Sequence, residues 1–321
     1  MHSVSIAFPI FGEGFIINPP RYISIFGFNL YLYGILIAIG FLIALLYLQK
    51  RRDAFGLSSS TVSDMVIIAI PSGIIGARLY YIIFNPANFF GEAGSFANII
   101  NLRQGGLAIY GGVLGAAVAY FIYSRVKKIP MPKLADAGAF GIFFGLMIGR
   151  WGNFINREAF GVETTLPWRM GLITETAAIY VHPTFLYESL WNLLGLILLH
   201  CFSKARKAKY YGQLFLLFVT WYGFGRFWIE GLRTDSLFLG GSDIRVSQLL
   251  AGASFVIAVA ALIWNRARGL ETIVYASEET ETPAEAPVKG NPVPDEPIKE
   301  TFNQDETASD ETEQTEPDNE D

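Results

Sequence analysis

Several charged side chains occur inside or at the ends of long apolar stretches of this chain. Arg150 lies near the end of one stretch, and Arg226, Glu230 and Arg233 lie near the end of another at spacings of four and three. These spacings place the last three residues on one helical face. The planar guanidinium of arginine matches the oxygens of phosphate, so we expect an anionic ligand with phosphate as the leading candidate.

Other polar residues occupy comparable positions in neighbouring stretches, namely Arg78, Tyr110, His182 and Glu188. Glu188 and Glu230 are also suited to be structural partners of arginines. Arg157 and Arg233 are suited to extend their charge to a membrane interface. Arg150 and Arg226 lie farther from the segment ends, where a charge is costly, so a functional role is favoured for both.

Cysteine and histidine are scarce in this sequence. The single cysteine, Cys201, excludes a disulfide within one chain and a cysteine-ligated metal site. The three histidines, His2, His182 and His200, are far apart. We therefore expect neither a metal centre nor a cofactor.

Long apolar segments must position the polar residues. Hydrophobic residues make up 52% of the chain and charged residues 17%, against about 25% charged residues in soluble domains. A helix needs roughly 20 apolar residues to cross a bilayer. Seven segments qualify: 29–49, 64–84, 105–123, 134–155, 184–203, 211–231 and 246–264. The sequence predicts an all-α, polytopic membrane protein with about seven transmembrane helices.

Basic clusters follow the first, third, fifth and seventh segments, at 50–52, 125–128, 204–209 and 266–268. The positive-inside rule assigns all four clusters to the cytoplasm. The N-terminus is then outside and the C-terminus cytoplasmic, and the polar residues gather at the outer helix ends. No Lys or Arg precedes Arg21, so the N-terminal residues lack the basic region of a signal peptide.

The second and third segments are rich in glycine. Small residues let helices approach closely, and buried polar groups there must be satisfied by neighbouring helices. We expect these two segments to be central and the smoothly apolar seventh segment to be peripheral.

Charge is unevenly distributed along the chain. From Glu271 onward there are 17 acidic residues and two lysines. Of the chain's 24 Lys+Arg and 29 Asp+Glu, the preceding 270 residues therefore hold 22 Lys+Arg and 12 Asp+Glu. This tail has too little apolar surface to fold, and we predict that it is disordered. The expected organisation is an outer arm at 1–28, a membrane catalytic domain at 29–268 and an acidic cytoplasmic tail at 269–321.

The stretch from Gly149 to Gly161 reads GRWGNFINREAFG. It resembles the pattern G-R-x-G-N-F-x-N-x-E-x-x-G of the prolipoprotein diacylglyceryl transferases, which fixes eight of thirteen positions. The resemblance runs over roughly residues 15 to 265. It includes LYG at 32–34, GARL at 76–79, HPT at 182–184, LYE at 186–188, and Arg226 with Glu230 and Arg233.

This resemblance implies a transferase of the bacterial plasma membrane that acts in lipoprotein biosynthesis. Such enzymes move the diacylglyceryl group of phosphatidylglycerol to the thiol of the lipobox cysteine in a preprolipoprotein, forming a thioether and releasing glycerol phosphate. The partners would be phosphatidylglycerol, lipobox signal peptides and the membrane, with no nucleic acid.

The resemblance also implies roles for individual residues. Arg150 and Arg226 match the family's arginines most closely tied to activity, so we expect them to bind phosphate and stabilise the leaving group. Asn153, Glu158 and Gly161 match other functional positions of the pattern, and Tyr33 matches a tyrosine at the site. Glu230 and Arg233 are expected to orient the other charges.

The proton acceptor for the substrate thiol is the open part of this interpretation, because the thiolate is the nucleophile. Many relatives carry a histidine where this chain has Tyr110. A tyrosine with a pKa of about 10 is a poor base at neutral pH unless nearby arginines lower that pKa. The alternatives are that Glu158 or another carboxylate accepts the proton, or that a histidine is not an obligatory base in these enzymes. A positional role is favoured for Tyr110.

Three other functions fit parts of the sequence. A lipid or metabolite transporter would suit glycine-rich spans with arginines, but seven spans do not divide into equal repeats. A scaffold for lipoprotein precursors leaves the 149–161 pattern unexplained. An intramembrane aspartyl peptidase is disfavoured because Asp64 and Asp136 are assigned to the cytoplasmic face, where each suits the start of a helix.

Overall fold

The computed structural model describes residues 4–12, 14–90, 96–101, 105–205, 207–240 and 242–270. The chain divides into two compact units, Met1–Glu279 and Thr280–Asp321. The second unit, and with it the expected tail from 271 onward, lies outside the described residues. Everything below concerns the first unit.

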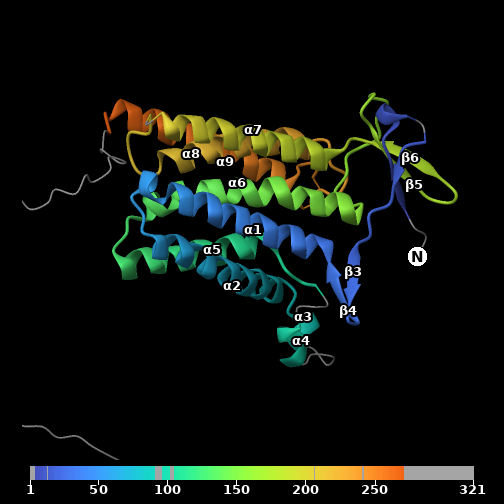
Figure 1. The fold of residues 1–321 in the computed structure, drawn as a ribbon, viewed down its shortest axis with the longest axis horizontal. Helices are drawn as coiled ribbons and strands as arrows, with labels where there is room; N and C mark the ends of the chain where they lie inside the picture. The colour runs from blue at the N-terminus through green and yellow to red at the C-terminus, as the bar shows by residue number, and fades with distance from the viewer. Residues whose placement is uncertain are drawn as a thin grey trace, which may run out of the picture. The chain divides into compact units, whose positions relative to one another are not determined.

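Among the described residues of this unit, seven long helices lie side by side in Figure 1. They are α1 (Leu32–Arg51), α2 (Ser59–Phe84), α5 (Ile109–Lys127), α6 (Met131–Asn156), α7 (Thr184–Lys204), α8 (Gln213–Glu230) and α9 (Val246–Ala267). All except α8 are long and apolar enough to cross a membrane. The prediction of a polytopic membrane protein is thus confirmed. The helix α8 falls short because Gln213, Arg226 and Glu230, together with two glycines, a tyrosine and two tryptophans, lower its mean hydropathy.

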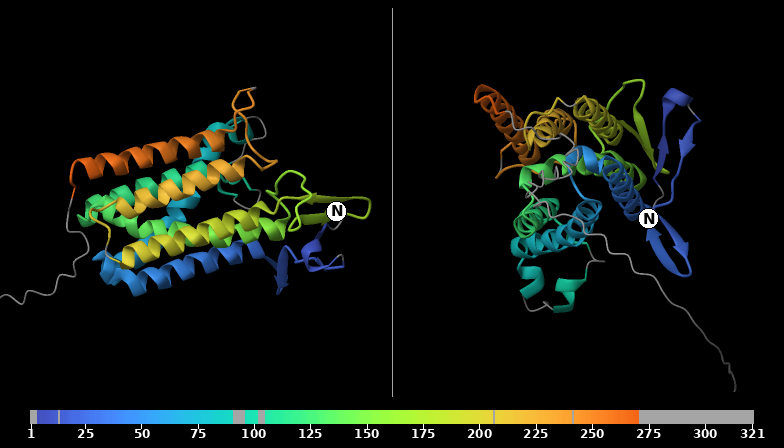
Figure 2. Two further views of the ribbon diagram at one scale, coloured as in Figure 1. Left: turned by 90° about the horizontal axis from the view of Figure 1, so that it is seen from above. Right: turned by 60° about the vertical axis from the view of Figure 1, so that its left-hand side comes forward.

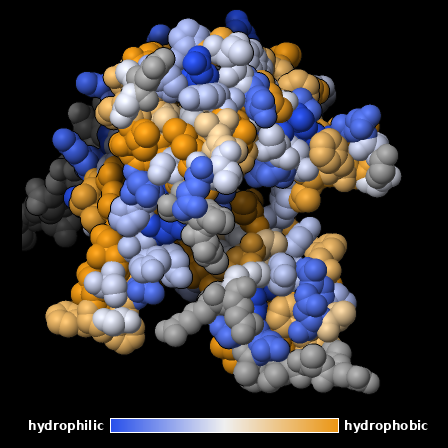
Figure 3. All heavy atoms as spheres, turned by 90° about the vertical axis from the view of Figure 1, so that its right-hand side faces the viewer, coloured by the Kyte–Doolittle hydropathy of each residue, from blue (hydrophilic) through white to orange (hydrophobic). Residues whose placement is uncertain are grey.

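Successive long helices run in alternating directions (Figures 1 and 2). The last turns of α1, α5, α7 and α9 carry basic residues, whereas those of α2, α6 and α8 carry none. The basic turns therefore gather at one end of the unit, which we call the basic end. Short strands lie at the opposite end, the strand end. Figure 3 views the strand end and shows hydrophilic and hydrophobic residues intermixed on it.

The prediction of an all-α fold is wrong in one respect, because the described residues also contain six short strands. An antiparallel sheet in the order β2-β1-β5-β6 joins β1 (Ser5–Ala7), β2 (Ile16–Ile17), β5 (Met170–Ile173) and β6 (Ala178–Val181). A separate hairpin pairs β3 (Tyr22–Ile25) with β4 (Phe28–Tyr31). Each strand has only two to four residues, too few to show an alternating pattern.

Shorter elements connect these parts. They are the helices α3 (Ala87–Phe90) and α4 (Phe96–Ile100) and the single 3₁₀ turns at Pro9–Phe11 and Arg52–Phe55. The residues expected to form an arm, 1–28, hold β1, β2 and β3 in their described part. The strand β1 pairs with β5, so Ser5 lies opposite Ile173 although the two are far apart in sequence.

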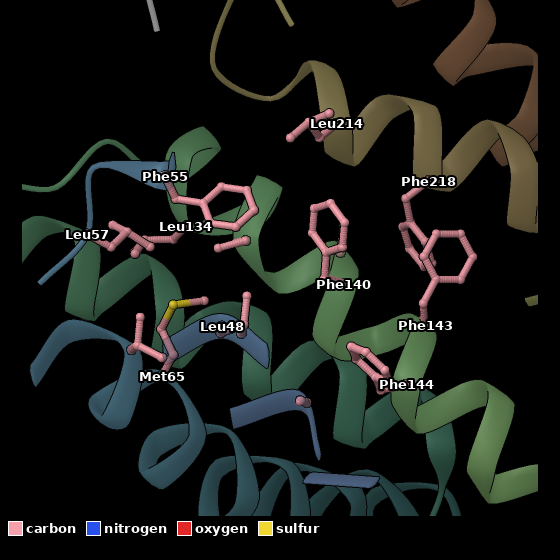
Figure 4. Close-up of a cluster of buried hydrophobic side chains, with 14 of the residues drawn as sticks. Leu48, Phe55, Leu57, Met65, Leu134, Phe140, Phe143, Phe144, Leu214 and Phe218 are labelled. Atoms are coloured by element: carbon pink, nitrogen blue, oxygen red, sulfur yellow. The ribbon is translucent and has the colours of Figure 1, made fainter. Parts of the chain in front are cut away.

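Helix α6 is the centre of the packing, in contact with α1, α7 and α8. Figure 4 shows large apolar side chains that fill this region, including Leu48, Phe55, Phe140 and Leu214, each at most 3% exposed. Within the 18-residue apolar window of each helix, 33% of α6 and 39% of α7 is buried, but only 17% of α2 and 17% of α5. The expectation that the glycine-rich segments are central is therefore wrong. The expectation that α9 is peripheral is confirmed, because only 11% of its apolar window is buried.

The glycines of α2 and α5 instead bring these two helices together as a pair. A Cβ on Gly76 would lie 2.4 Å from the carbonyl oxygen of Gly111, and a Cβ on Gly115 would lie 2.4 Å from that of Ser72. Only glycine permits such an approach. Close helix contact was thus correctly predicted, but it serves one helix pair rather than the core.

Candidate active site

A single carboxylate, that of Glu188 on α7, lies at the centre of the arginine cluster. Its Oε2 is 2.6 Å from Nη2 of Arg150, and its Oε1 is 2.8 Å from Nη1 of Arg226 and 3.2 Å from Nη1 of Arg233. These arginines come from α6, from α8 and from the turn that follows α8. Only 4% of the Glu188 side chain is exposed. A buried carboxylate is tolerable here because three guanidinium groups compensate its charge.

A second carboxylate, Glu230, holds two of the same arginines. Its Oε2 is 2.6 Å from Nη2 of Arg226 and 3.8 Å from Nε of Arg233. The Ser236 hydroxyl donates to its Oε1 at 2.8 Å, and Arg233 also donates two hydrogen bonds to Asp235. The ion-pair network thus contains three arginines and three carboxylates, and its formal charges cancel.

The pKa values of Arg233 and Asp235 follow from this pairing. Burial alone would lower the pKa of Arg233, but Asp235, Glu188 and Glu230 outweigh it and raise that pKa. Burial alone would raise the pKa of Asp235, but its hydrogen bonds and charge interaction with Arg233 lower it. Both groups are therefore firmly charged at neutral pH.

The 149–161 stretch extends the network away from Glu188. Arg150 donates from Nη1 to Oδ1 of Asn153 at 3.2 Å, and Asn153 donates from Nδ2 to Oε1 of Glu158 at 3.0 Å. Asn156 donates to the same Glu158 oxygen at 3.2 Å. A continuous chain of polar contacts therefore joins Glu158 to Arg150 and onward to Glu188.

Two glycines of the same stretch allow close approaches beside the network. A Cβ on Gly161 would lie 2.7 Å from Cβ of His182 and 3.1 Å from the carbonyl oxygen of Leu232. Gly161 also forms an isolated β-bridge with Arg233, which fixes the backbone of that arginine. A Cβ on Gly152 would lie 2.0 Å from Cδ2 of Tyr33, so this glycine admits the Tyr33 ring from the start of α1.

Helices α7 and α8 are held in register by two tryptophans. The rings of Trp191 and Trp221 stack with centroids 4.3 Å apart. Each indole N–H donates to the backbone carbonyl of the other residue, at 3.0 and 2.9 Å. Trp191 follows Glu188 by about one turn and Trp221 precedes Arg226 by more than one turn, so this contact helps to set the distance between the ionic partners.

Other residues singled out from the sequence lie away from the network. The Tyr110 hydroxyl, on the first turn of α5, is 3.2 Å from the Ser247 hydroxyl of α9, and Tyr110 is 41% exposed. Arg78 donates its hydrogen bonds to backbone carbonyls of the connection before α5, at Asn98, Ile99, Asn101, Gly105 and Gly106. It therefore holds that connection in place.

His182 and the aspartates also have local roles. A ring nitrogen of His182 is 3.2 Å from the Tyr187 hydroxyl, and burial lowers the pKa of His182. Asp64 accepts a hydrogen bond from the Tyr123 hydroxyl at 2.8 Å. Asp136 accepts from the backbone N–H groups of Gly212 and Phe215 and so caps the start of α8.

Sequence reasoning underestimated three residues. The expected pairing of Glu188 with arginines is present, but the sequence does not indicate that three arginines share this one carboxylate. Asp235 follows Arg233 by two residues and had no helical spacing to mark it. Tyr222 precedes Arg226 by four residues and lies within the field of Arg150, Glu188, Arg226 and Glu230. That spacing of four was the available signal.

The arrangement is suited to binding an anion rather than a metal. Among the residues that the structure describes, no group of three His, Cys, Asp or Glu side chains could hold a metal ion. Two cavities lie elsewhere at the strand end: about 140 Å³ around Arg78 and about 280 Å³ beside Arg21 and Arg157. Carboxylates occupy the space between the clustered arginines, of which Arg150 and Arg226 are the more accessible at 17% and 14% side-chain exposure.

Comparison with known proteins identifies the family of this chain. The family model described as prolipoprotein diacylglyceryl transferase matches residues 20–264. A phosphatidylglycerol–prolipoprotein diacylglyceryl transferase of Bacillus cereus (strain G9842) is 41% identical over 250 residues, covering 75% of this chain and 90% of the relative. The transferase of Bacillus anthracis (strain A0248) is 42% identical over 250 residues, which again cover 75% of this chain and 90% of the relative. The chain belongs to the prolipoprotein diacylglyceryl transferase family.

Proposed function

We propose that this protein transfers the diacylglyceryl group of phosphatidylglycerol to the thiol of the lipobox cysteine of preprolipoproteins. A thioether forms and glycerol phosphate leaves. The observation that carries the proposal is the convergence of Arg150 and Arg226, from two helices, on one carboxylate at the strand end. A pair of guanidinium groups that holds a carboxylate in this way is equally suited to hold a phosphate.

Arg150 and Arg226 bind the phosphate of the lipid and stabilise the charge that develops on it. The carbon–oxygen bond between the diacylglyceryl carbon and the phosphate breaks, so the leaving group gains negative charge in the transition state. Fixed positive charge in a site with little water stabilises that state more than the ground state. The two guanidinium groups supply this positive charge, so the proposed step uses no metal or cofactor.

The remaining residues of the site position these two arginines. Asn153 orients Arg150, while Glu230 and Arg233 orient Arg226. Gly161 fixes the backbone of Arg233, and Tyr33 packs on the helix that carries Arg150. All of them contribute to phosphatidylglycerol binding through the geometry of the arginines.

Glu158 is the proposed proton acceptor for the substrate thiol. Its side chain is exposed, and Asn153 and Asn156 both donate to one of its oxygens. It is also connected through Asn153 to Arg150. Tyr110 is less suited, because its hydroxyl faces Ser247 and no described contact joins it to an arginine of the cluster. A positional role for Tyr110 follows.

We also propose a topology. Helix α8 lies between α7 and α9 and contacts both, which supports seven spans rather than six. The basic last turns of α1, α5, α7 and α9 favour a cytoplasmic basic end. The strand end, the N-terminus and the site then face outward in a bacterial plasma membrane. The C-terminal tail is cytoplasmic, and the protein's partners are phosphatidylglycerol and lipobox signal peptides.

A transfer assay tests this proposal. Purified protein is incubated with phosphatidylglycerol vesicles and a lipobox peptide, and mass spectrometry follows the gain of one diacylglyceryl unit on the peptide cysteine. Arg150→Ala and Arg226→Ala should abolish the gain while the protein still inserts. Wild-type protein that moves lipid between leaflets but leaves the peptide unmodified would instead establish the transporter alternative.

A further inference from the structure

We propose that the Glu188 carboxylate occupies the place of the substrate phosphate in the free enzyme and yields it when phosphatidylglycerol binds. This inference rests on the proposed function and concerns the same site. It assigns Glu188 the role of a positioning residue that sets how tightly phosphate groups are held.

The geometry of Glu188 is that of a bound anion. One carboxylate oxygen contacts Arg150 at 2.6 Å and the other contacts Arg226 at 2.8 Å, so the group bridges the two arginines assigned to phosphate. A phosphate with two oxygens in these positions would make the same contacts. Both cannot occupy the space between the guanidinium groups at once.

The charge of the network favours the same exchange. Arg150, Arg226 and Arg233 are balanced by Glu188, Glu230 and Asp235. Addition of a phosphate to this balanced and largely buried network would leave uncompensated negative charge, which is costly in a medium of low dielectric constant. Withdrawal of one carboxylate from Arg150 and Arg226 lowers this cost, because it separates that carboxylate from the phosphate and frees the two guanidinium groups.

Glu188 is the carboxylate whose contacts allow withdrawal. Glu230 is held additionally by the Ser236 hydroxyl, and Asp235 is held by a bidentate pair with Arg233 on its own turn. Among the described contacts, the Glu188 carboxylate has only guanidinium partners.

Arg233 provides the alternative partner. Its Nη1 is 3.2 Å from Oε1 of Glu188, and at 9% side-chain exposure it is less accessible than Arg150 and Arg226. Rotation of Glu188 toward Arg233 leaves its charge paired. The same movement uncovers Arg150 and Arg226 for the lipid phosphate, and its reversal helps to expel glycerol phosphate after transfer.

Replacement of Glu188 distinguishes this role from a purely structural one. Glu188→Gln keeps the size of the side chain but leaves the network with one excess positive charge. Phosphate groups should then bind more tightly, by about tenfold, within the usual range of coupling between two ligands. Turnover should fall because glycerol phosphate leaves slowly. A structural role predicts the opposite, since disordered arginines would bind phosphate more weakly.

The experiment measures the inhibition constant of glycerol phosphate in the transfer assay and its dissociation constant by calorimetry, with full-length protein in detergent. Glu163→Gln is the matched control, because Glu163 is exposed, follows the 149–161 stretch by two residues and has no described contact with the network. We expect both constants to fall about tenfold in Glu188→Gln and to be unchanged in the control. Unchanged or raised constants in folded Glu188→Gln protein would overturn the inference.

Glu188→Asp provides a second test if the glutamine variant does not fold. The aspartate keeps the charge but is one methylene shorter, so it cannot bridge Arg150 and Arg226 as closely, and the constants should also fall. Constants equal to those of the wild type would again overturn the inference. Absence of peptide modification by the wild type would refute the proposed function instead, while calorimetry would still decide whether Glu188 competes with phosphate.

Discussion

Substitution of Gly152 tests the closest approach at the site. The Cβ of Gly152→Ala would lie 2.0 Å from Cδ2, 2.5 Å from Cε2 and 3.0 Å from Cγ of Tyr33. Ordinary contacts begin near 3.4 Å, so the ring must retreat by about 1.4 Å, the difference between 3.4 and 2.0. Tyr33 belongs to the first turn of α1, and this retreat would lift its ring from the surface of α6 at Gly152.

The expected change in stability combines two effects of opposite sign. Alanine favours a helix over glycine by about 1 kcal/mol. Overpacking costs about 1–3 kcal/mol. Gly149→Ala is the matched control. Gly149 lies in the same helix as Gly152, and a Cβ on it would meet no neighbouring atom within 4 Å. The free energy of unfolding of Gly152→Ala should therefore lie about 1–3 kcal/mol below that of Gly149→Ala.

Activity should be more sensitive than stability. Displacement of Tyr33 disturbs the part of α6 that carries Arg150 and Asn153, and a misplacement of about 1 Å can cost about 100-fold in rate. The assays are diacylglyceryl transfer to a lipobox peptide and thermal unfolding in detergent. In a Tyr33→Ala background, Gly152→Ala and Gly149→Ala should be equally stable, since the clash is removed. Equal stability and transfer rate in Gly152→Ala and Gly149→Ala would refute this reasoning.

Three further predictions follow from contacts outside the arginine network. Tyr110→Phe should retain most of the transfer rate, because the described partner of its hydroxyl is Ser247 and not an arginine of the cluster; a large loss at neutral pH would assign it a chemical role. Burial lowers the pKa of His182 below its unfolded value of about 6.5, so its stabilising contribution is present above that value and is lost as pH falls below it. Thermal unfolding between pH 7.5 and 5.5 (roughly one unit either side) should show this loss, and His182→Asn should reduce it; an identical pH dependence would contradict the assignment. Asp136→Ala should lower the unfolding free energy by about 1–3 kcal/mol, because two backbone N–H groups at the start of α8 lose their acceptor, while exposed Asp243→Ala should not.

Local patterns predicted the long helices well. The segment expected at 184–203 is α7 (Thr184–Lys204), and the one expected at 246–264 is α9 (Val246–Ala267). Hydropathy along one segment depends only on that segment, so it can be read without knowledge of its neighbours. The spacing of Arg226, Glu230 and Arg233 is likewise local, and the structure joins all three in one network.

Tertiary structure decided the contacts between segments. Glu188 is 38 residues from Arg226 and 45 residues from Arg233, and only the packing of α7 against α8 brings it to both. The pairing of β1 with β5 and the insertion of Tyr33 against Gly152 are equally non-local. The sequence by itself determined which residues are charged, which helices carry them and that they favour an anion. The packing of those helices determined that a carboxylate of the protein holds the arginines together, because complementary charges select their partners by position in space rather than by spacing along the chain.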